Sequence, residues 1–420
     1  MNPVKTLVAI GLLGLAGCAT PPPAGGGHGH AKPAAAAKPA APTPEERAKM
    51  WKKSLARDPL SMTAAFDATG RLWLAAVKSG HVVVNYSSDK GRSFGAPVQV
   101  NAEPENIAAD GENRPKLAFG PKGEIYVSWT QSLDTPFSGH VRFARSLDGG
   151  KSFSAPIVVN TDRQAISHRF DSLLVNGRGD IYLFWLDKRD AAASEGKGGK
   201  YSGLAVYYAV STDGGASFGA NRKAADHSCE CCRIAAAADT DDVPVILWRQ
   251  IFGKNTRDHA LLRLDGKSTL VRASEDGWEL DACPHHGPSL SIGADGVYHL
   301  AWYTGAEGRA GLYYRRSLDR GKTFTAPLAF GDPGAQPARP QVLSLGPRVF
   351  LTWKEFDGAS SAVRLMRSMD GGATWSAPAL VATAAGASDH PLLVRDGAKA
   401  YLSWYAAKEG YRLVELEGAR

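Results

Sequence analysis

The chain has 420 residues, of which 44% are hydrophobic, 9% aromatic and 22% charged. This composition excludes a wholly disordered or fibrous chain, and the length alone suggests about two or three domains. The formal net charge is +7. Its basic residues are interspersed with acidic ones rather than gathered in runs, so we expect no nucleic-acid partner.

The first 17 residues predict a secretory signal peptide. Lys5 precedes the apolar run Leu7 to Leu15, which is too short to stay in a bilayer as a spanning helix. The run leads into Leu15-Ala16-Gly17-Cys18, which resembles the lipobox of bacterial lipoproteins. The resemblance implies cleavage before Cys18, lipidation of its thiol and, because Ala19 is not aspartate, an outer-membrane destination. The alternative is an ordinary signal peptide with a chance cysteine.

Residues 18–57 predict a tether and a short helix. From Ala19 to Pro44 the chain consists mainly of Pro, Ala and Gly, which cannot build a core, so we expect a flexible linker. Two histidines of this stretch, His28 and His30, could touch a metal, although a solvated linker accounts for them better. Pro44 to Ala56 predicts a short helix with Thr43 as its N-cap.

Residues 58–420 contain one repeat in seven copies. Each copy has a short strand of alternating residues, and the strands lie roughly 50 to 60 residues apart. Six of them end in tryptophan and one in alanine, namely at Ala76, Trp129, Trp185, Trp248, Trp302, Trp353 and Trp404. Each copy offers four strands, and a closed ring of such units removes the exposed sheet edges.

A second pattern, Ser-x-Asp-x-Gly-x-x-Phe/Trp, follows five of these strands. Its copies begin at Ser87, Ser146, Ser211, Ser317 and Ser368, with a remnant at Leu264-Asp265-Gly266-Lys267. Ser and Asp bond turn amides, Gly takes a positive φ and the aromatic ring packs into the sheet. The pattern resembles the Asp-box, or BNR repeat, of bacterial sialidases and related propellers. The resemblance implies a β-propeller in which these turns have a structural role and no catalytic one.

We therefore expect an all-β protein with a single β-propeller of seven four-stranded blades over residues 58–420. Sialidases have six blades, so six is the alternative. The seventh unit shows three recognisable strands, and a segment near Trp51 to Ser61 is the candidate for its fourth. The Asp-box turns are expected on the face opposite the functional site.

Strand parity places the start of each first strand on that opposite face, and six of the seven starts carry a cation. They are Arg114, Arg169, Arg233, His286, Arg339 and His390. Such a ring would give the channel mouth a positive potential that attracts carboxylate, sulfate or phosphate groups. The alternative is that each Arg pairs with backbone carbonyls or with an Asp of the next blade. The anion-binding set we predict is Arg114, Arg169, Arg233, Arg339 and His390.

Sialidases are similar in holding the sialic-acid carboxylate with three arginines on this face, beside a Tyr nucleophile, its Glu and an Asp acid/base. By position, the candidates for that triad are Arg114, Arg169, Arg233 and Arg339. The family's N-terminal Arg-Ile-Pro signature is missing, because the stretch reads Asp58-Pro-Leu-Ser-Met62. No Tyr and Glu pair can be matched. The resemblance therefore covers the fold and leaves the catalytic set unassigned.

Cysteines and histidines gather where units four and five begin. The two segments read His227-Ser-Cys229-Glu-Cys231-Cys232-Arg233 and Cys283-Pro-His285-His286, and adjacent blades place them side by side at the mouth. Two disulfides are the ordinary expectation outside the cytosol, but every pairing joins two of the three neighbouring cysteines in a strained ring. One long bridge to Cys283, or a Cu(I) or Zn site, avoids that strain. The predicted ligands are His227, Cys229, Cys231, Cys232, Cys283, His285 and His286.

The leading hypothesis is a lipid-anchored, sialidase-like propeller that binds a ligand or a soft metal, Cu or Zn, at its cationic mouth. An exo-sialidase that cleaves terminal sialic acid is the alternative, and a non-catalytic scaffold for another envelope protein is a third. The expected partners are an anionic small molecule or glycan, or an envelope protein. We expect contact with the membrane through the lipid alone.

Overall fold

The computed structural model of the chain describes residues 43, 45–46, 49 and 58–417. The predicted signal peptide, the lipidation site Cys18 and the predicted tether lie outside the described residues. Of the short helix predicted over Pro44 to Ala56, the structure describes Glu45, Glu46 and Lys49, which are helical. Within the described part of the chain, no helix is long and apolar enough to cross a membrane.

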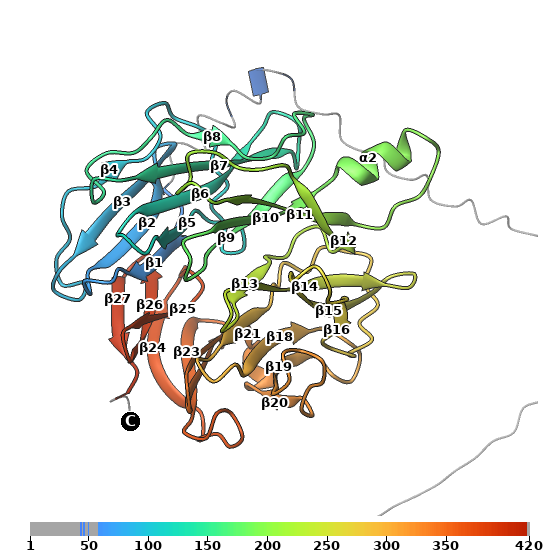
Figure 1. Cartoon of the computed structure of the whole chain (residues 1–420). Helices are drawn as coiled ribbons and strands as arrows, with labels where there is room; N and C mark the ends of the chain where they lie inside the picture. The colour runs from blue at the N-terminus through green and yellow to red at the C-terminus, as the bar shows by residue number, and fades with distance from the viewer. Residues whose placement is uncertain (1–42, 44, 47–48, 50–57, 418–420) are drawn as a thin grey trace, which may run out of the picture. The chain divides into compact units, whose positions relative to one another are not determined.

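The described residues form seven antiparallel blades in chain order (Figure 1). Blade 1 contains β1 (Met62–Phe66), β2 (Leu72–Lys78), β3 (His81–Ser87) and β4 (Val98–Gln99), and blade 2 contains β5 (Lys116–Phe119), β6 (Ile125–Ser132), β7 (Gly139–Ser146) and β8 (Ile157–Val158). Blade 3 contains β9 (His168–Val175), β10 (Ile181–Asp187), β11 (Leu204–Ser211) and β12 (Arg222–Ser228), with the helix α2 (Arg189–Glu195) between β10 and β11. Blade 4 contains β13 (Ala235–Ala238), β14 (Pro244–Phe252), β15 (Thr256–Arg263) and β16 (Val271–Arg272).

The remaining blades complete the series. Blade 5 contains β17 (Ser289–Ile292), β18 (Tyr298–Thr304), β19 (Gly311–Ser317) and β20 (Leu328–Phe330), and a 3-10 turn η1 (Pro333–Ala335) follows it. Blade 6 contains β21 (Ala338–Leu345), β22 (Arg348–Phe356), β23 (Ser360–Ser368) and β24 (Ala379–Ala385). Blade 7 contains β25 (Leu392–Asp396), β26 (Lys399–Ala406) and β27 (Gly410–Glu415).

The first strands of the blades lie next to one another in a closed ring. In the order β1, β5, β9, β13, β17, β21 and β25, each packs against the next, and β25 packs against β1. Closure leaves these inner strands without a free edge. The predicted all-β propeller with seven blades is thereby confirmed.

Two blades depart from the regular plan. Blades 3 and 4 are joined into one eight-stranded sheet, because β12 also pairs with β14 where Ser228 lies opposite Gln250. Blade 7 has three strands among the described residues. The segment predicted to complete it, near Trp51 to Ser61, is described only from Asp58 on, where the chain forms no strand before Met62.

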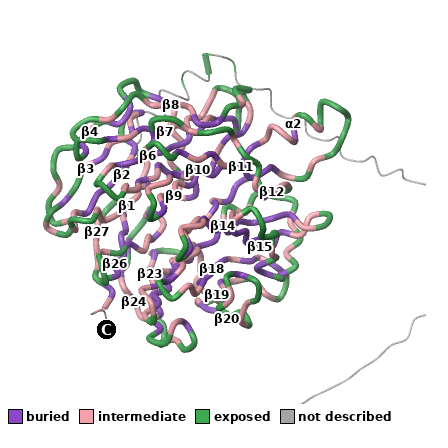
Figure 2. The backbone as a smooth tube through the Cα atoms, viewed as in Figure 1, coloured by how far each residue is buried: buried purple, intermediate pink, exposed green. Residues whose placement is uncertain are grey.

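The hydrophobic core lies between neighbouring blades. The six tryptophans that end the repeated strands are 2% exposed or less, and each indole N–H donates to a buried acceptor. Trp129 of blade 2, for example, packs with Ala75 and Val84 of blade 1 and donates to Glu105 at 2.9 Å. Figure 2 shows buried stretches along the strands and exposed ones at the loops that join them. The repeat thus supplies one large buried ring per interface between blades.

The Ser-x-Asp-x-Gly turns form one face of the propeller. In blade 5 the Ser317 hydroxyl accepts from the Gly321 amide and donates to Asp319, each at 2.8 Å. The carboxylate of Asp319 in turn accepts from the amide and hydroxyl of Thr323. Strand register places these turns at the end of each blade opposite the start of its first strand. The site predicted at the first-strand starts therefore lies on the other face.

Candidate functional site

The mouth of the propeller is built where the first strands begin, and its backbone is locally strained. Phe170 at the start of β9 and Arg339 at the start of β21 both have φ of 58°, beside irregularities in the strand pairing. His285, in the loop before β17, has φ of 50°. Such left-handed conformations are unfavourable for residues other than glycine and tend to occur at functional sites.

The buried carboxylate of Glu112 pairs with two arginines of the mouth. It comes from the loop before β5, is 3% exposed, and accepts hydrogen bonds from Arg233 Nη1 at 2.7 Å and Arg339 Nη1 at 3.0 Å. The Gly287 amide also donates to it at 2.9 Å. Burial by itself raises the pKa of Glu112, but the charges of Arg233 and Arg339 outweigh burial, so its pKa lies below the ordinary value. One acid of blade 2 thus neutralises cations that lead into blades 4 and 6.

A second buried ion pair joins the segments that lead into blades 2 and 7. Arg114, before β5, donates through both Nη atoms to Asp389, before β25, at 2.7 Å each. Its Nη1 also donates to the Met62 carbonyl at 2.6 Å. Burial raises the pKa of Asp389, and the charge of Arg114 offsets part of that rise. Arg114 therefore pairs with an Asp, as the alternative for the ring arginines expected, but with one that leads into blade 7 and not into the next blade.

The two histidines of the predicted ring are neutral at neutral pH. His390 packs against Gly111, and its Nδ1 lies 3.8 Å from Glu112 Oε1. Burial, followed by the charge of Arg339, holds the pKa of His390 well below its ordinary value. His286 stacks on Tyr303 with 4.2 Å between ring centroids, and burial lowers its pKa to about 3. The positive charge at the starts of the first strands therefore comes from arginine.

Three cysteines converge in the turn between β12 and β13. Cys229, Cys231 and Cys232 are 1%, 3% and 2% exposed, and all three are free thiols. Their sulfur atoms lie 3.9, 3.9 and 4.0 Å apart, which is nearly an equilateral triangle. Dividing the side by √3 puts the triangle's centre about 2.3 Å from each sulfur, which is the length of a zinc–thiolate bond. Within the described residues, these three make up the one group of Cys, His, Asp and Glu side chains that could share a metal ion.

Arginines surround the three thiols. Arg257 Nη1 donates to Cys229 Sγ at 3.1 Å. Arg249, which is 1% exposed, donates to the carbonyls of Arg257, His286 and Tyr303, and its guanidinium lies over the Trp278 ring at 4.9 Å. Its hydrogen-bond acceptors in the described part of the chain are all backbone oxygens. A buried guanidinium without a carboxylate favours thiolates beside it.

The pKa values of the three thiols shift in different directions. Hydrogen bonds from Cys231 and then Cys232 hold the pKa of Cys229 well below its ordinary value, with further help from Arg257. Burial and the bond to Cys229 raise the pKa of Cys232 to about 12, and the pKa of Cys231 is raised as well. Of the three thiols, Cys229 is therefore the one whose lowered pKa favours the thiolate.

Four of the predicted ligands do not join this group. His227 is exposed, its ring lies 4.7 Å from Tyr201, and its Nδ1 bonds the Ser202 carbonyl at 3.1 Å. His286 is held in its stack on Tyr303. Cys283 and His285 are both exposed, in the loop that leads from blade 4 into blade 5.

Sequence reasoning missed the residues that neutralise and support the mouth. The carboxylates of Glu112 and Asp389 pair with most of the ring arginines, and Arg257 donates to one of the thiols. Glu112 stands two residues before Arg114 in a loop whose sequence gives no sign that it reaches across the axis. Its partners lie 121 and 227 residues away along the chain. The neighbouring Gly111 is needed for space, since a methyl group there would lie 2.1 Å from His390 Cε1.

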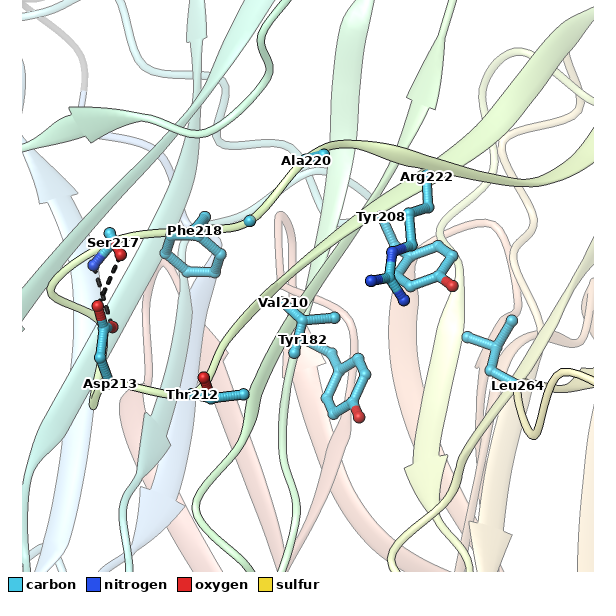
Figure 3. A pocket seen from close by; sticks show the side chains of 11 residues that line it. Tyr182, Tyr208, Val210, Thr212, Asp213, Ser217, Phe218, Ala220, Arg222 and Leu264 are labelled. Carbon is cyan, nitrogen blue, oxygen red and sulfur yellow. Dashed lines mark hydrogen bonds between the residues drawn. The ribbon is translucent and has the colours of Figure 1, made fainter.

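A separate groove of about 480 Å³ lies between blades 3 and 4, towards the face with the turns (Figure 3). Tyr182, Tyr208 and Phe218 line it together with Arg222, and all four are at least partly exposed. In Figure 3 the hydrogen-bonded pair Asp213 and Ser217 stands at one end and Leu264 at the other. The groove offers aromatic faces and one guanidinium to a ligand.

No family model and no curated protein matches this sequence. Among solved structures, the BP39L lectin from Burkholderia pseudomallei is similar, with a TM-score of 0.60 and 11% identity over 86% of this chain and 97% of the lectin. A polysaccharide lyase of family PL25, an ulvan lyase bound to -[GlcA(1-4)Rha3S]-, gives 0.56 and 12% over 86% and 94%. The NanB sialidase from Streptococcus pneumoniae gives 0.45 and 10% over 72% and 66%. At such identities, the two higher-scoring likenesses establish a shared fold.

Proposed function

We propose that this propeller binds a soft metal ion, Cu or Zn, through Cys229, Cys231 and Cys232 at its mouth. The observation that carries the proposal is the triangle of buried, unpaired sulfurs 3.9 to 4.0 Å apart. Thiolates are the ligands that Cu(I) and Zn prefer. The predicted histidines His227, His285 and His286 are left out of this proposal because they do not join the group.

Charge supports the same proposal. Three thiolates around one Cu(I) or Zn carry a net negative charge, which is costly to bury without nearby cations. Arg257 touches Cys229, Arg249 is close enough to lower the pKa of Cys229 and Cys232, and Cys231 acts on the pKa of Arg169. The arginine shell therefore supplies the charge that a metal–thiolate centre requires.

Metal analysis under reducing conditions tests the proposal. Purified protein should take up about one Cu(I) or Zn per chain, and Cys229→Ser should lower uptake at least tenfold because it removes one of three ligands. Ser317→Ala, on the opposite face, is the matched control and should leave uptake unchanged. Protein that holds neither metal and instead forms two disulfides would overturn the proposal.

The exo-sialidase alternative is less well supported by the arginines. Arg114 is paired with Asp389, and Arg233 and Arg339 share Glu112, so three of the four candidates for a substrate-carboxylate triad already bind carboxylates of this chain. We expect no release of fluorophore from a fluorogenic sialoside. Release that is lost in Arg339→Ala would favour the sialidase instead.

A glycan ligand is a second candidate, and the groove between blades 3 and 4 favours it. Its aromatic side chains suit the apolar faces of sugars, and Arg222 suits an acidic group. The similar lectin and the ulvan lyase are both proteins of carbohydrate recognition by name. Calorimetric titration with acidic oligosaccharides should show binding that Tyr208→Ala weakens. No heat with neutral or acidic sugars would remove this candidate.

We further propose that Cys18 carries a lipid that anchors the protein to the outer membrane. The lipobox-like stretch Leu15-Ala16-Gly17-Cys18 supports this proposal. Cys18→Ala should convert a membrane-pelleted protein into one released by osmotic shock, and wild-type protein found in the released fraction would contradict it. Co-purification with an envelope complex, without metal, would favour the scaffold hypothesis.

A further inference from the structure

We propose that the metal is Cu(I), and that Cys283 is the ligand through which Cu(I) reaches and leaves the buried trio of Cys229, Cys231 and Cys232. This inference rests on the proposed metal-binding function and goes beyond it, because it names the oxidation state and a route of transfer. The structure supports it by the number of ligands, by burial, and by the placement of one loop.

The number of ligands favours Cu(I). Among the described residues, no histidine or carboxylate joins the three sulfurs within bonding reach of one ion. Thiolates bind both Zn and Cu(I), but a structural Zn site takes four ligands, whereas three thiolates are enough for Cu(I). An ion in the plane of the triangle, about 2.3 Å from each sulfur as calculated above, needs no fourth ligand. The trio is therefore a three-coordinate site.

Burial means that an ion cannot reach this site directly. The three cysteines are 3% exposed or less, so a donor complex in solution cannot touch their sulfurs. Cys283 is the exposed cysteine of the described chain. A thiol that is open to solvent and next to the buried ones would supply the missing step.

The loop that carries Cys283 is fastened beside the trio at both ends. Arg257, which bonds Cys229, also donates to the Leu280 carbonyl at 3.1 Å. At the other end, Gly287 packs against Arg233, the residue after Cys232. Cys283 stands three residues after Leu280 and four residues before Gly287, so it lies between the two fastened ends. The loop therefore holds the segment that carries Cys283 beside the trio.

Transfer is a sequence of ligand exchanges at constant oxidation state. A donor thiolate complex brings Cu(I); the Cys283 thiol loses its proton to solvent as its sulfur bonds copper, and one donor sulfur leaves and takes up a proton. The Cys231 sulfur then bonds copper as its own proton leaves, and the bond to Cys283 breaks and its thiol is protonated again. Cu(I) gains and loses no electrons. Bonds from Cys229 and Cys232 complete the site as their remaining protons pass to solvent and the last donor sulfur leaves and takes up a proton.

Stopped-flow loading of the folded protein from Cu(I)–glutathione tests this role, with a bathocuproine competition for equilibrium affinity. Cys283→Ser should slow loading at least tenfold while it leaves one Cu(I) per chain and changes affinity by less than about threefold. Ala282→Ser, the neighbouring exposed residue of the same loop, is the matched control and should load at the wild-type rate. The far-ultraviolet spectrum of each variant checks that it is folded.

The outcomes separate this inference from the proposed function. If wild-type protein binds neither Cu(I) nor Zn, the proposed function fails and the inference with it. If Cu(I) binds but Cys283→Ser loads at the wild-type rate, only the transfer role is overturned. If the protein prefers Zn and Cys283→Ser weakens Zn binding more than tenfold, Cys283 is instead a fourth Zn ligand and the choice of Cu(I) is wrong.

Discussion

The two faces of this propeller are made in opposite ways. On the turn face, five Ser-x-Asp-x-Gly copies satisfy their own hydrogen bonds within a few residues, and in each copy the Ser is buried while the Asp is at least partly exposed to water. At the mouth, the main contacts join residues of different blades, such as Arg114 with Asp389, 275 residues apart. Buried ion pairs and buried thiols gather on that face.

Residues that recur in each repeat therefore build the turn face, whereas residues that differ from one blade to the next build the mouth. A local turn can be copied, because all its partners are copied with it. A cross-ring contact cannot, because each partner must be chosen for one place. Features that could bind a metal are therefore found where the repeat is broken, and the predictions below test that division.

Removing the central acid should have the largest effect. Glu112→Ala leaves the partly buried Arg233 and Arg339 without their carboxylate, and breaking a buried pair costs about 3 to 5 kcal/mol. Urea unfolding measures the loss. Glu415→Ala, which breaks the exposed pair with Lys399, is the control and should cost less than about 1 kcal/mol. Equal losses in the two variants would mean that the mouth is no more dependent on its charges than the surface.

A buried histidine next to the turn face should make stability depend on pH. His299 is 0% exposed, and burial lowers its pKa to about 4. Below its ordinary pKa near 6.5, the unfolded chain binds a proton that the folded chain does not, so stability falls as pH drops from about 6.5 to 4. His299→Gln should reduce the loss between pH 7 and 4.5 by about 2 kcal/mol in urea unfolding. An unchanged loss would show that His299 does not contribute to it.

A glycine at the mouth is needed for space. A methyl group at Gly111 would overlap the ring of His390, so Gly111→Ala should destabilise the fold by about 1 to 3 kcal/mol. In the double variant Gly111→Ala, His390→Ala the clash is gone, and we expect most of that stability to return in thermal unfolding. At Gly91 on the turn face, by contrast, glycine is needed for its backbone conformation, because the turn requires φ of 82°. If the second substitution gives no recovery, contact with His390 is not the cause.

Single turns should contribute least, and by equal amounts. Ser317→Ala, Ser146→Ala and Ser368→Ala each remove the same three hydrogen bonds, so each should cost about 1 kcal/mol. Differential scanning calorimetry of the three variants checks this equality. One turn that costs several times more than the others would show that the copies are not independent.

The fold could be predicted because its signal is local and repeated. Each Trp-ended strand and each Ser-x-Asp-x-Gly turn can be recognised from its own residues alone. Together they predict the blades, their number and the two faces. The convergence of Cys229, Cys231 and Cys232 was also within reach, because these residues are adjacent along the chain and follow a strand.

The electrostatics of the mouth could not be predicted in the same way. Strand parity places Arg233 and Arg339 on the ring, but nothing near them in the sequence names Glu112 as their partner. The neutral state of His286 and His390 depends on burial by residues of other blades. Long-range pairing across a closed ring is decided by three-dimensional packing, which a pattern within one blade does not encode.

The single bridge between Ser228 and Gln250 gives the thiol trio a rigid base. It joins blades 3 and 4 into one sheet at the residue before Cys229, whose own amide donates to the Arg249 carbonyl at 2.9 Å. An ion bound to the trio would add a cross-link at the junction of the two blades. Slower hydrogen exchange of the Cys229 amide in the metal-bound than in the metal-free protein would then show that this junction opens less often. The rigidity of the propeller would depend on whether the trio holds a metal ion.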